Sequence, residues 1–226
     1  DIVIYESTVY PGCTEDYCAR IIEEKSGLSS GKDFFLGYSP ERTNFGDKEH
    51  NISNITKVVS GQNEETLEII SDLYGYVAKH GVYQAKTIRI AESSKVIENI
   101  QRDLNIALFN ELSMIFDRMN ISSSDVFEAA STKWNFNRYT PGLVGGHCVP
   151  VDPYYLTYKA QELGFTPKTI LSGRAVNESV PKFLSEKISK SLLSLETSQS
   201  GNILVLGQTF KPDVSDARNS KSIELC

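Results

Sequence analysis

The sequence lacks the features that mark membrane, secreted and nucleic-acid-binding proteins. It contains no run of about 18 apolar residues, so we expect no transmembrane span, and no signal peptide is visible. Its net charge of -6 argues against a non-specific nucleic-acid or membrane-surface binder, because both need a basic face. A hydrophobic content of 40% and a charged content of 23% are ordinary for a globular domain. We therefore expect a cytoplasmic globular protein.

Cysteine is also scarce. Four cysteines in 226 residues are too few for a disulfide scaffold, so we expect reduced thiols. Zinc is disfavoured as well: adjacent residues such as His147 and Cys148 rarely ligate one ion, and the Cys13-x4-Cys18 pair has no matching second pair. We expect no metal site.

The two ends of the sequence resemble the interior of a protein. The chain opens on D-I-V-I-Y, which is typical of a strand, and closes on K-S-I-E-L-C, which is typical of a helix. We therefore expect an internal fragment of a longer protein. Its length still allows one large or two small domains with a substantial core.

Short apolar runs alternate with helical patterns at the start of the chain. Strands are expected at 2–5, 34–36, 58–59 and 82–83. One helix is expected through 21–24, and a second follows Asn63, which is positioned to cap it. This alternation predicts an α/β layer with a largely parallel sheet.

A long helix is expected from Ala91 onwards. One apolar stripe runs over nearly thirty residues without proline or glycine: Ile97, Ile100, Leu104, Leu108, Leu112, Ile115 and Met119. Such a broad apolar face fits a central core helix or a helix that packs against its copy in a second subunit, and the pattern does not decide between them.

The remaining expected elements follow in order. Ser122 begins the cap of a short helix, and further helices are expected at 154–163 and at about 183–195. Residues 194–202 are typical of a linker. The run 203–207 is expected to be a buried strand that opens a new α/β domain.

The glycine-rich stretch G-L-V-G-G-H-C-V-P-V-D-P contains a candidate nucleophile, Cys148. Thiolate is the reactive form of cysteine and needs nearby donors or positive charge. Gly145 and Gly146 would let a substrate approach closely, and Asp152 is positioned to orient a water or relay a proton. A structural cysteine would usually lie within apolar periodicity, so we favour a functional role.

Two further groups of polar residues accompany this loop. Lys95 and Asn99 are spaced i, i+4 on the long helix, which suits them to holding an oxyanion, although a helical lysine is usually a solvated charge. Glu41 and Arg42 in S-P-E-R, and Thr8 in E-S-T-V, come at strand ends, where α/β sheets place ligand groups.

Together these motifs carry a family resemblance. The set E-S-T-V-x-P-G, S-P-E-R, K-V-I-E-N, P-G-L-V-G-G-H-C-V-P-V-D-P-Y-Y-L and G-Q-T-F-K-P-D-V-S-D-A-R-N-S-K-S resembles the UDP-glucose/GDP-mannose dehydrogenase family. The G-G-H-C-x-x-V-D-P-Y-Y-L form is similar to its UDP-N-acetylhexosamine branch. The resemblance implies the C-terminal part of a Rossmann-like NAD domain (1–86), a central all-α domain with the cysteine loop (87–195), and the start of a second Rossmann-like nucleotide-sugar domain (196–226).

The resemblance implies an NAD-dependent oxidation of the sugar C6 hydroxyl to a carboxylate, with two NAD+ used in succession. Cys148 would form a thiohemiacetal and then a thioester, Lys95 and Asn99 would stabilise oxyanions, and Asp152 would order protons. Glu41 would act in thioester hydrolysis while Thr8 places water. The implied cofactor contacts are Ser7, Thr8, Val9, Cys148 and Arg218. The implied substrate contacts are Glu41, Arg42, Lys95, Asn99, Tyr139, Gly142, Gly145, Phe210 and Lys211.

Three points qualify the resemblance. Phe45 stands where the UDP-glucose branch has a second glutamate, which favours the N-acetylated branch over the alternatives of UDP-glucose or GDP-mannose oxidation. No G-x-G-x-x-G opens any strand, so we expect the 226 residues alone to bind NAD poorly and turn over little. A homodimer through the long helix is expected, with Arg138 only a candidate for an arginine inserted across subunits.

Two other classes of function compete with the dehydrogenase. A cysteine hydrolase would use Cys148 with a histidine, but His147 is expected to point away from its neighbour in an extended loop, and His50 and His80 have no recognisable context. A non-catalytic dimerisation module would keep the fold without the chemistry.

Overall fold

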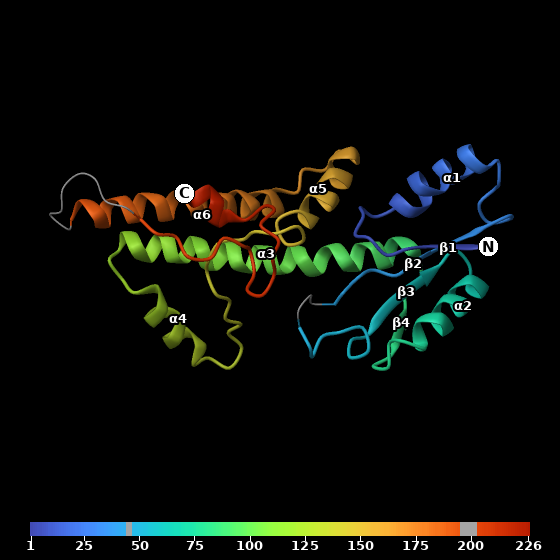
Figure 1. Cartoon of the computed structure of the whole chain (residues 1–226), viewed down its shortest axis with the longest axis horizontal. Coiled ribbons are helices and arrows are strands. Elements are labelled where there is room, and N and C mark those ends of the chain that lie inside the picture. Colours follow the sequence, from blue (N-terminus) through green and yellow to red (C-terminus); the bar gives the residue numbers. More distant parts are fainter. Residues whose placement is uncertain (44–46, 195–202) are drawn as a thin grey trace. The chain divides into compact units, whose positions relative to one another are not determined.

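The computed structural model describes residues 1–43, 47–194 and 203–226. The chain divides into two compact units, which are described separately (Figure 1). Unit 1 comprises Asp1–Glu98 and Tyr154–Thr166, and unit 2 comprises Asn99–Pro153 and Pro167–Cys226. None of the helices in the described residues combines the length and the hydropathy needed to cross a membrane.

Unit 1 is built on a four-stranded sheet in the order β1-β2-β3-β4. The strands are β1 (Ile2–Tyr5), β2 (Phe35–Tyr38), β3 (Lys57–Gly61) and β4 (Val82–Gln84). β1 pairs with β2 and β3 with β4 in parallel, whereas β2 and β3 are antiparallel. The predicted α/β layer with a largely parallel sheet is confirmed, with one antiparallel pair inside it.

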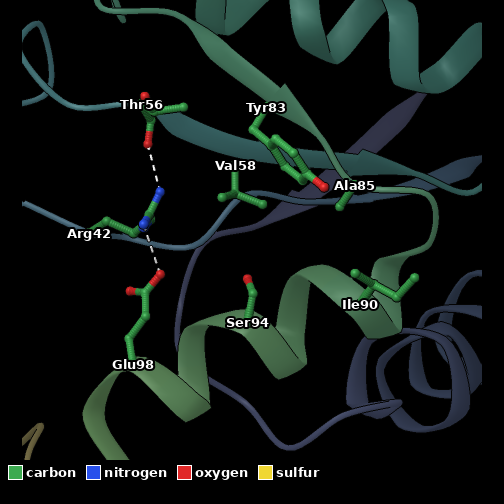
Figure 2. Close-up of a pocket in the computed structure, with 8 residues that line it drawn as sticks. All are labelled: Arg42, Thr56, Val58, Tyr83, Ala85, Ile90, Ser94 and Glu98. Carbon is green, nitrogen blue, oxygen red and sulfur yellow. Dashed lines mark hydrogen bonds and ion pairs between the residues drawn. The ribbon is translucent and has the colours of Figure 1, made fainter. Parts of the chain in front are cut away.

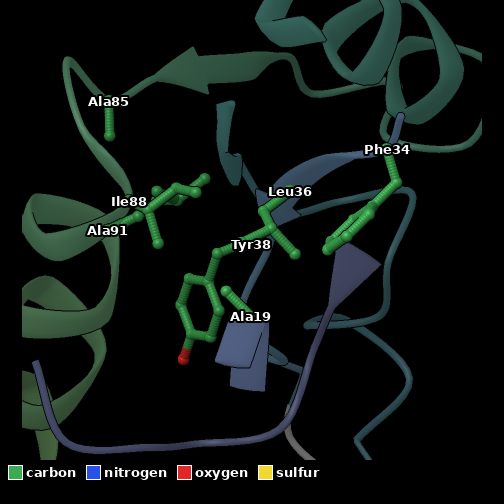
Figure 3. Packing of buried hydrophobic residues seen from close by; sticks show 8 residues of the cluster. Ala19, Phe34, Leu36, Tyr38, Ala85, Ile88 and Ala91 are labelled. Atoms are coloured by element: carbon green, nitrogen blue, oxygen red, sulfur yellow. The ribbon is translucent and has the colours of Figure 1, made fainter. Parts of the chain in front are cut away.

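Helices cover both faces of this sheet. α2 (Glu64–Gly75) packs on β2, β3 and β4. The predicted cap is present, because the Asn63 side chain accepts a hydrogen bond from the backbone N–H of Thr66 at 2.8 Å. On the other face Leu36 and Tyr38 pack with residues of α1 (Ala19–Ser26) and of the first turn of α3 (Figure 3). A π-helical turn, η1 (Cys13–Cys18), leads into α1.

Unit 2 is helical. Its elements are the C-terminal part of α3 (Ile88–Arg118), α4 (Ser123–Ser131), the first residues of α5 (Asp152–Glu162), α6 (Lys168–Leu193) and α7 (Lys221–Leu225). α6 lies against α3 because Gly173 has no side chain: a Cβ there would meet Leu104 Cδ2 at 2.3 Å. α4 is capped by Ser122, as predicted, and packs Phe127 on Phe109 with ring centroids 4.8 Å apart.

Two expectations for the C-terminal part are wrong. α6 begins at Lys168 rather than near residue 183, and it continues through Pro181, which is buried against its neighbours. The predicted buried strand at 203–207 is absent, and Leu204 and Leu206 are each 82% exposed. A strand needs a neighbour for its backbone groups, and this segment pairs with none in the described residues. The end of the predicted helix at residue 195, most of the linker and the domain boundary at 195/196 lie outside the described residues, so the three-domain division stays a prediction.

The long helix has an unexpected distribution of polarity. Ile97, Leu108 and Ile115 of the predicted apolar stripe are exposed. The buried face on the opposite side instead carries Glu92, Asn99, Asp103 and Asn110, spaced seven, four and seven residues apart. The helix is therefore not a simple hydrophobic core helix.

Candidate active site

Cys148 lies in an exposed turn immediately before α5. Its carbonyl oxygen accepts hydrogen bonds from the backbone N–H groups of Val151 and Asp152, at 3.1 and 2.8 Å. These bonds close the turn and set the start of α5 four residues after the thiol. Cys148 therefore lies in a loop, where the sequence placed it, and its side chain is exposed.

Asn99 forms a buried hydrogen-bonded pair with Asp152, the first residue of α5. Asn99 Nδ2 donates a hydrogen bond to Asp152 Oδ2 at 2.5 Å, although the two residues are 53 positions apart. The structure therefore brings together two residues that the sequence placed in one site. Lys95 lies one helical turn before Asn99, half-buried, and makes no hydrogen bond or ion pair within the described part of the chain. Its ammonium group is thus available to a ligand.

A buried asparagine on α3 anchors the glycine-rich segment that precedes Cys148. Asn110 on α3 bonds both backbone groups of Gly142: its Nδ2 donates to the Gly142 oxygen at 3.0 Å, and its Oδ1 accepts from the Gly142 nitrogen at 2.7 Å. Asn110 Nδ2 also donates to Asn177 Oδ1 at 2.8 Å, and Asn177 in turn donates to Asp103. A chain of buried polar groups therefore ties the segment before Cys148 to α3 and α6.

Two residues near the C-terminus, Phe210 and Asn219, also contact this segment. Gly146 donates a hydrogen bond to the Asn219 oxygen at 3.2 Å. A Cβ on Gly146 would lie 2.8 Å from the Phe210 ring, and a Cβ on Gly145 would lie 2.8 Å from the Asn219 oxygen. Both glycines are therefore required for this close packing, which places Phe210 beside the loop.

His147 is oriented differently from the prediction. Its Nδ1 lies 3.3 Å from Cys148 Sγ, so the two neighbouring side chains do not point apart. The expectation assumed extended backbone, whereas Gly146 has φ +92° and the following residues form a turn. The histidine is thus within reach of the thiol proton.

Other predicted contacts in unit 2 have partners of their own. Arg218 binds Asp216 through both carboxylate oxygens, with Nη2–Oδ2 at 2.6 Å. The Tyr139 ring is half-buried near Phe109, with centroids 6.1 Å apart. Lys211 is half-buried in the segment after Phe210, and its carbonyl accepts from the Thr209 hydroxyl at 3.0 Å.

In unit 1 the predicted residues meet at one edge of the sheet. Ser7, Thr8 and Val9 follow β1, while Glu41 and Arg42 follow β2. The strands are parallel and the pairing continues past their ends, since Glu41 N donates to Glu6 O at 3.2 Å. This carboxyl edge is where open α/β sheets bind ligands.

Glu41 is held in its charged form. Partial burial alone would raise its pKa, but hydrogen bonds from Thr43, one of them at 2.5 Å, and the nearby Lys57 charge leave the pKa below its usual value. Lys57 is fully buried and donates to the Pro40 oxygen at 3.0 Å. Its charge adds to the larger effect of the Thr43 hydrogen bonds in keeping the carboxylate ionised.

Arg42 lines a pocket of about 360 Å³ in unit 1 (Figure 2). Its guanidinium donates to the Thr56 oxygen at 2.8 Å and forms an ion pair with Glu98 at 2.8 Å. The rest of the wall is mostly apolar and includes Tyr83 and Ile90. Since Glu98 already neutralises the guanidinium, an anion would have to displace that carboxylate.

The residues that follow β1 supply only part of what a dinucleotide-binding site needs. Thr8 and Ser7 offer hydroxyl and backbone groups at the carboxyl edge, and the Tyr38 hydroxyl donates to the Ser7 oxygen at 3.2 Å, which fixes the loop. No glycine-rich turn for a pyrophosphate is present in the sequence. Phe45 lies outside the described residues.

Sequence reasoning missed Lys57, Asn110 and Asp216, and it rejected His147 as a base for Cys148. Asn110 could have been found, because it recurs at helical spacing with Glu92, Asn99 and Asp103 along one side of the long helix. The other three depend on tertiary contacts or on one backbone angle. No set of three His, Cys, Asp or Glu side chains in the described residues is arranged to hold a metal ion.

Two domains of one protein family match the chain. Residues 1–78 match the NAD binding domain of the UDP-glucose/GDP-mannose dehydrogenase family, and residues 89–179 match its central domain. The chain belongs to this family. The resemblance inferred from the motifs is thereby confirmed.

Several relatives are named as dehydrogenases of UDP-N-acetylhexosamines. The chain is 55% identical to Protein CapL of Staphylococcus aureus over 99% of its own length and 53% of that protein, and 51% identical to the UDP-N-acetyl-D-glucosamine 6-dehydrogenase of Pseudomonas aeruginosa over 100% and 54%. The solved UDP-D-ManNAc dehydrogenase of Pyrococcus horikoshii superposes with a TM-score of 0.88 at 33% identity, covering 99% of the chain and 53% of that structure. The chain thus spans about half the length of the relatives it matches.

Proposed function

We propose that this chain supplies the catalytic centre for NAD-dependent oxidation of the C6 hydroxyl of a UDP-N-acetylhexosamine to a carboxylate. The observation that carries the proposal is the exposed Cys148 thiol on a turn that leads directly into the buried Asn99–Asp152 pair. The names of the relatives support the substrate class. UDP-glucose and GDP-mannose remain the alternative substrates.

Cys148 is the nucleophile in this proposal. NAD+, when bound, accepts a hydride at each of the two oxidations. Cys148 adds to the C6 aldehyde as a thiohemiacetal and then carries the acyl group as a thioester, so the aldehyde does not escape between steps. The Lys95 ammonium and the Asn99 amide stabilise the oxyanions. Asp152 holds the Asn99 amide in place.

Glu41 serves the hydrolytic step. Because its pKa lies below the usual value, it is ionised at neutral pH and acts as an acceptor that orients or deprotonates water, with Thr8 as a second water ligand. Hydrolysis of the thioester releases the carboxylate and returns the thiol.

The remaining predicted residues are assigned to binding. Arg42, Tyr139, Gly142, Gly145, Phe210 and Lys211 are assigned to the nucleotide sugar, while Ser7, Thr8, Val9 and Arg218 are assigned to the cofactor. Arg42 and Arg218 must exchange Glu98 and Asp216, respectively, for their ligands. A homodimer through α3 and a cytoplasmic location complete the proposal.

The test is the dehydrogenase activity of the gene's full-length product on a panel of UDP-N-acetylhexosamines, followed as absorbance at 340 nm. Cys148→Ser is expected to lower kcat by about 10³-fold or more, because the covalent step is lost. Cys226→Ser, at another exposed thiol, is the matched control and should keep the activity. Full activity in Cys148→Ser would overturn the mechanism.

One observation favours a second candidate function. The 3.3 Å contact between Cys148 Sγ and His147 Nδ1 is the geometry of a cysteine hydrolase pair. Hydrolysis of a p-nitrophenyl ester without NAD, lost in Cys148→Ser, would favour this candidate. Nicotinamide-dependent turnover without esterase activity would reject it.

A further inference from the structure

The His147 ring is held by contacts on several sides. Nδ1 faces Cys148 Sγ at 3.3 Å, and Nε2 lies 3.8 Å from Asp216 Oδ2. The Phe210 ring packs edge-on against the imidazole, with centroids 5.5 Å apart at 73°. Thiol, imidazole and carboxylate therefore stand in a row, although the first two are neighbours in sequence.

The carboxylate at the end of this row is charged over the whole working range of a protein. Hydrogen bonds from the Arg218 side chain and backbone lower the pKa of Asp216 to about 2. An ionised carboxylate near Nε2 attracts the positive charge that the imidazole gains when it accepts a proton. Arg218 shares the same carboxylate and offsets part of that effect, so Asp216 is expected to contribute less than the histidine itself.

We propose that His147 is a catalytic residue that takes the proton of the Cys148 thiol and holds the resulting thiolate as an ion pair. The proton moves from Sγ to Nδ1, and Asp216 stabilises the imidazolium that forms. When the thiolate adds to a carbonyl carbon, the new bond is S–C and the π electrons of the carbonyl move onto oxygen. The imidazolium proton is then available to that oxygen.

This inference rests on the proposed role of Cys148 as nucleophile. The charged groups that bear on it are Asp216 at Nε2 and Arg218 behind it, and within the described residues no other ion pair is made by the His147 ring. A purely structural histidine would pack in the same place without changing the reactivity of the thiol. The two cases differ in a pH profile.

The experiment measures the alkylation rate of Cys148 by iodoacetamide between pH 5 and 9, with the modified peptide quantified by mass spectrometry. A Cys226→Ser background removes the second exposed thiol. An ordinary thiol with a pKa of about 8.5 is about 1% thiolate at pH 6.5. A histidine partner raises the thiolate fraction at least tenfold. A more acidic thiol is also a weaker nucleophile, so the alkylation rate rises by less than the thiolate fraction does.

His147→Asn is therefore expected to slow alkylation at pH 6.5 by about fivefold or more and to move the inflection upwards. Asp216→Asn should give a smaller shift in the same direction, and His80→Asn, a histidine elsewhere in the chain, should give none. Superimposable profiles for His147→Asn and the parent would overturn the proposal. If circular dichroism shows that His147→Asn does not fold, Asp216→Asn decides, and an unchanged profile there also overturns it.

The readout is independent of the dehydrogenase reaction, because it needs neither NAD nor sugar. A shifted profile in a full-length protein without oxidation would keep the His147 assignment and reject the proposed function. Oxidation of the sugar with an unshifted alkylation profile would keep the proposed function and reject the His147 assignment.

Discussion

The buried ion pair between Arg174 and Asp103 gives the sharpest test of how unit 2 is held together. Arg174 is 2% exposed and Asp103 0%, and Nη1 donates to Oδ1 at 2.5 Å. Among the described residues, Arg174→Leu would leave the buried Asp103 carboxylate with the Asn177 amide as its side-chain donor. Removing one partner of a buried pair costs about 3–5 kcal/mol.

That loss corresponds to a fall in Tm of about 6–20 °C, at roughly 2–4 °C per kcal/mol for a chain of this size. Thermal unfolding by circular dichroism at 222 nm measures it, since α3 and α6 supply much of the helical signal. The matched control is Asp103→Leu combined with Arg174→Leu, which removes both charges and should recover most of the stability. A double variant no more stable than Arg174→Leu alone would refute the reasoning.

The pH dependence follows from the same carboxyl. Burial raises the pKa of Asp103 and outweighs the lowering by Arg174 and Asn177, and its Oδ2 accepts no hydrogen bond within the described residues. A carboxyl with a raised pKa binds its proton more tightly in the folded state, so stability from this group is highest at low pH and falls as pH rises through the folded pKa. Without Arg174 the pKa rises further. The deficit of Arg174→Leu should therefore be smaller at about pH 4.5 than at about pH 7.5.

Two further substitutions test the loop and the exposed helix face. Gly146→Ala adds a Cβ at φ +92° and 2.8 Å from Phe210, so it should destabilise by about 1–3 kcal/mol and change the alkylation rate of Cys148. Gly142→Ala is the control, because its Cβ meets nothing within 4 Å, and equal losses in both variants would contradict this account. Leu108→Glu should convert a dimer to a monomer in light-scattering chromatography, whereas Leu163→Glu, exposed away from α3, should not. A monomeric parent chain would refute dimerisation through this face.

The sequence predicted local structure well where the signal was local. The caps at Asn63 and Ser122, the four strands and the long helix are set by patterns of a few residues, and all are present. It failed where packing overrides a local rule. Pro181 is a helix breaker in isolation, yet α6 runs through it. The helix is bound to α3 on both sides of the proline, by Asn177 to Asp103 before it and by Lys187 to Asp117 after it.

The candidate site shows the same limit. The motifs named Cys148, Asn99 and Asp152 as one group, and the last two are in contact. The orientation of His147 depends on the positive φ of one glycine, and glycine adopts either sign, so no sequence rule selected it. The role of Asp216 depends on a contact 69 positions away along the chain, which motif spacing does not report.

The buried polar residues of α3 are explained by the contacts that they make. Three of the four buried polar residues on the helix bond segments that carry or adjoin candidate functional groups: Glu92 accepts from the nitrogens of Gly12 and Thr14, Asn99 donates to Asp152, and Asn110 pairs with Gly142. The fourth, Asp103, pairs with Arg174 and Asn177 of α6. Apolar side chains would pack such loops but give them no fixed register, whereas directional bonds to backbone groups do. The polar residues share the inner face with apolar ones such as Val96, Ile100 and Phe109, whereas Ile97, Leu108 and Ile115 are exposed on the outer face. The homodimer proposed above would cover these exposed residues with the same residues of a second copy.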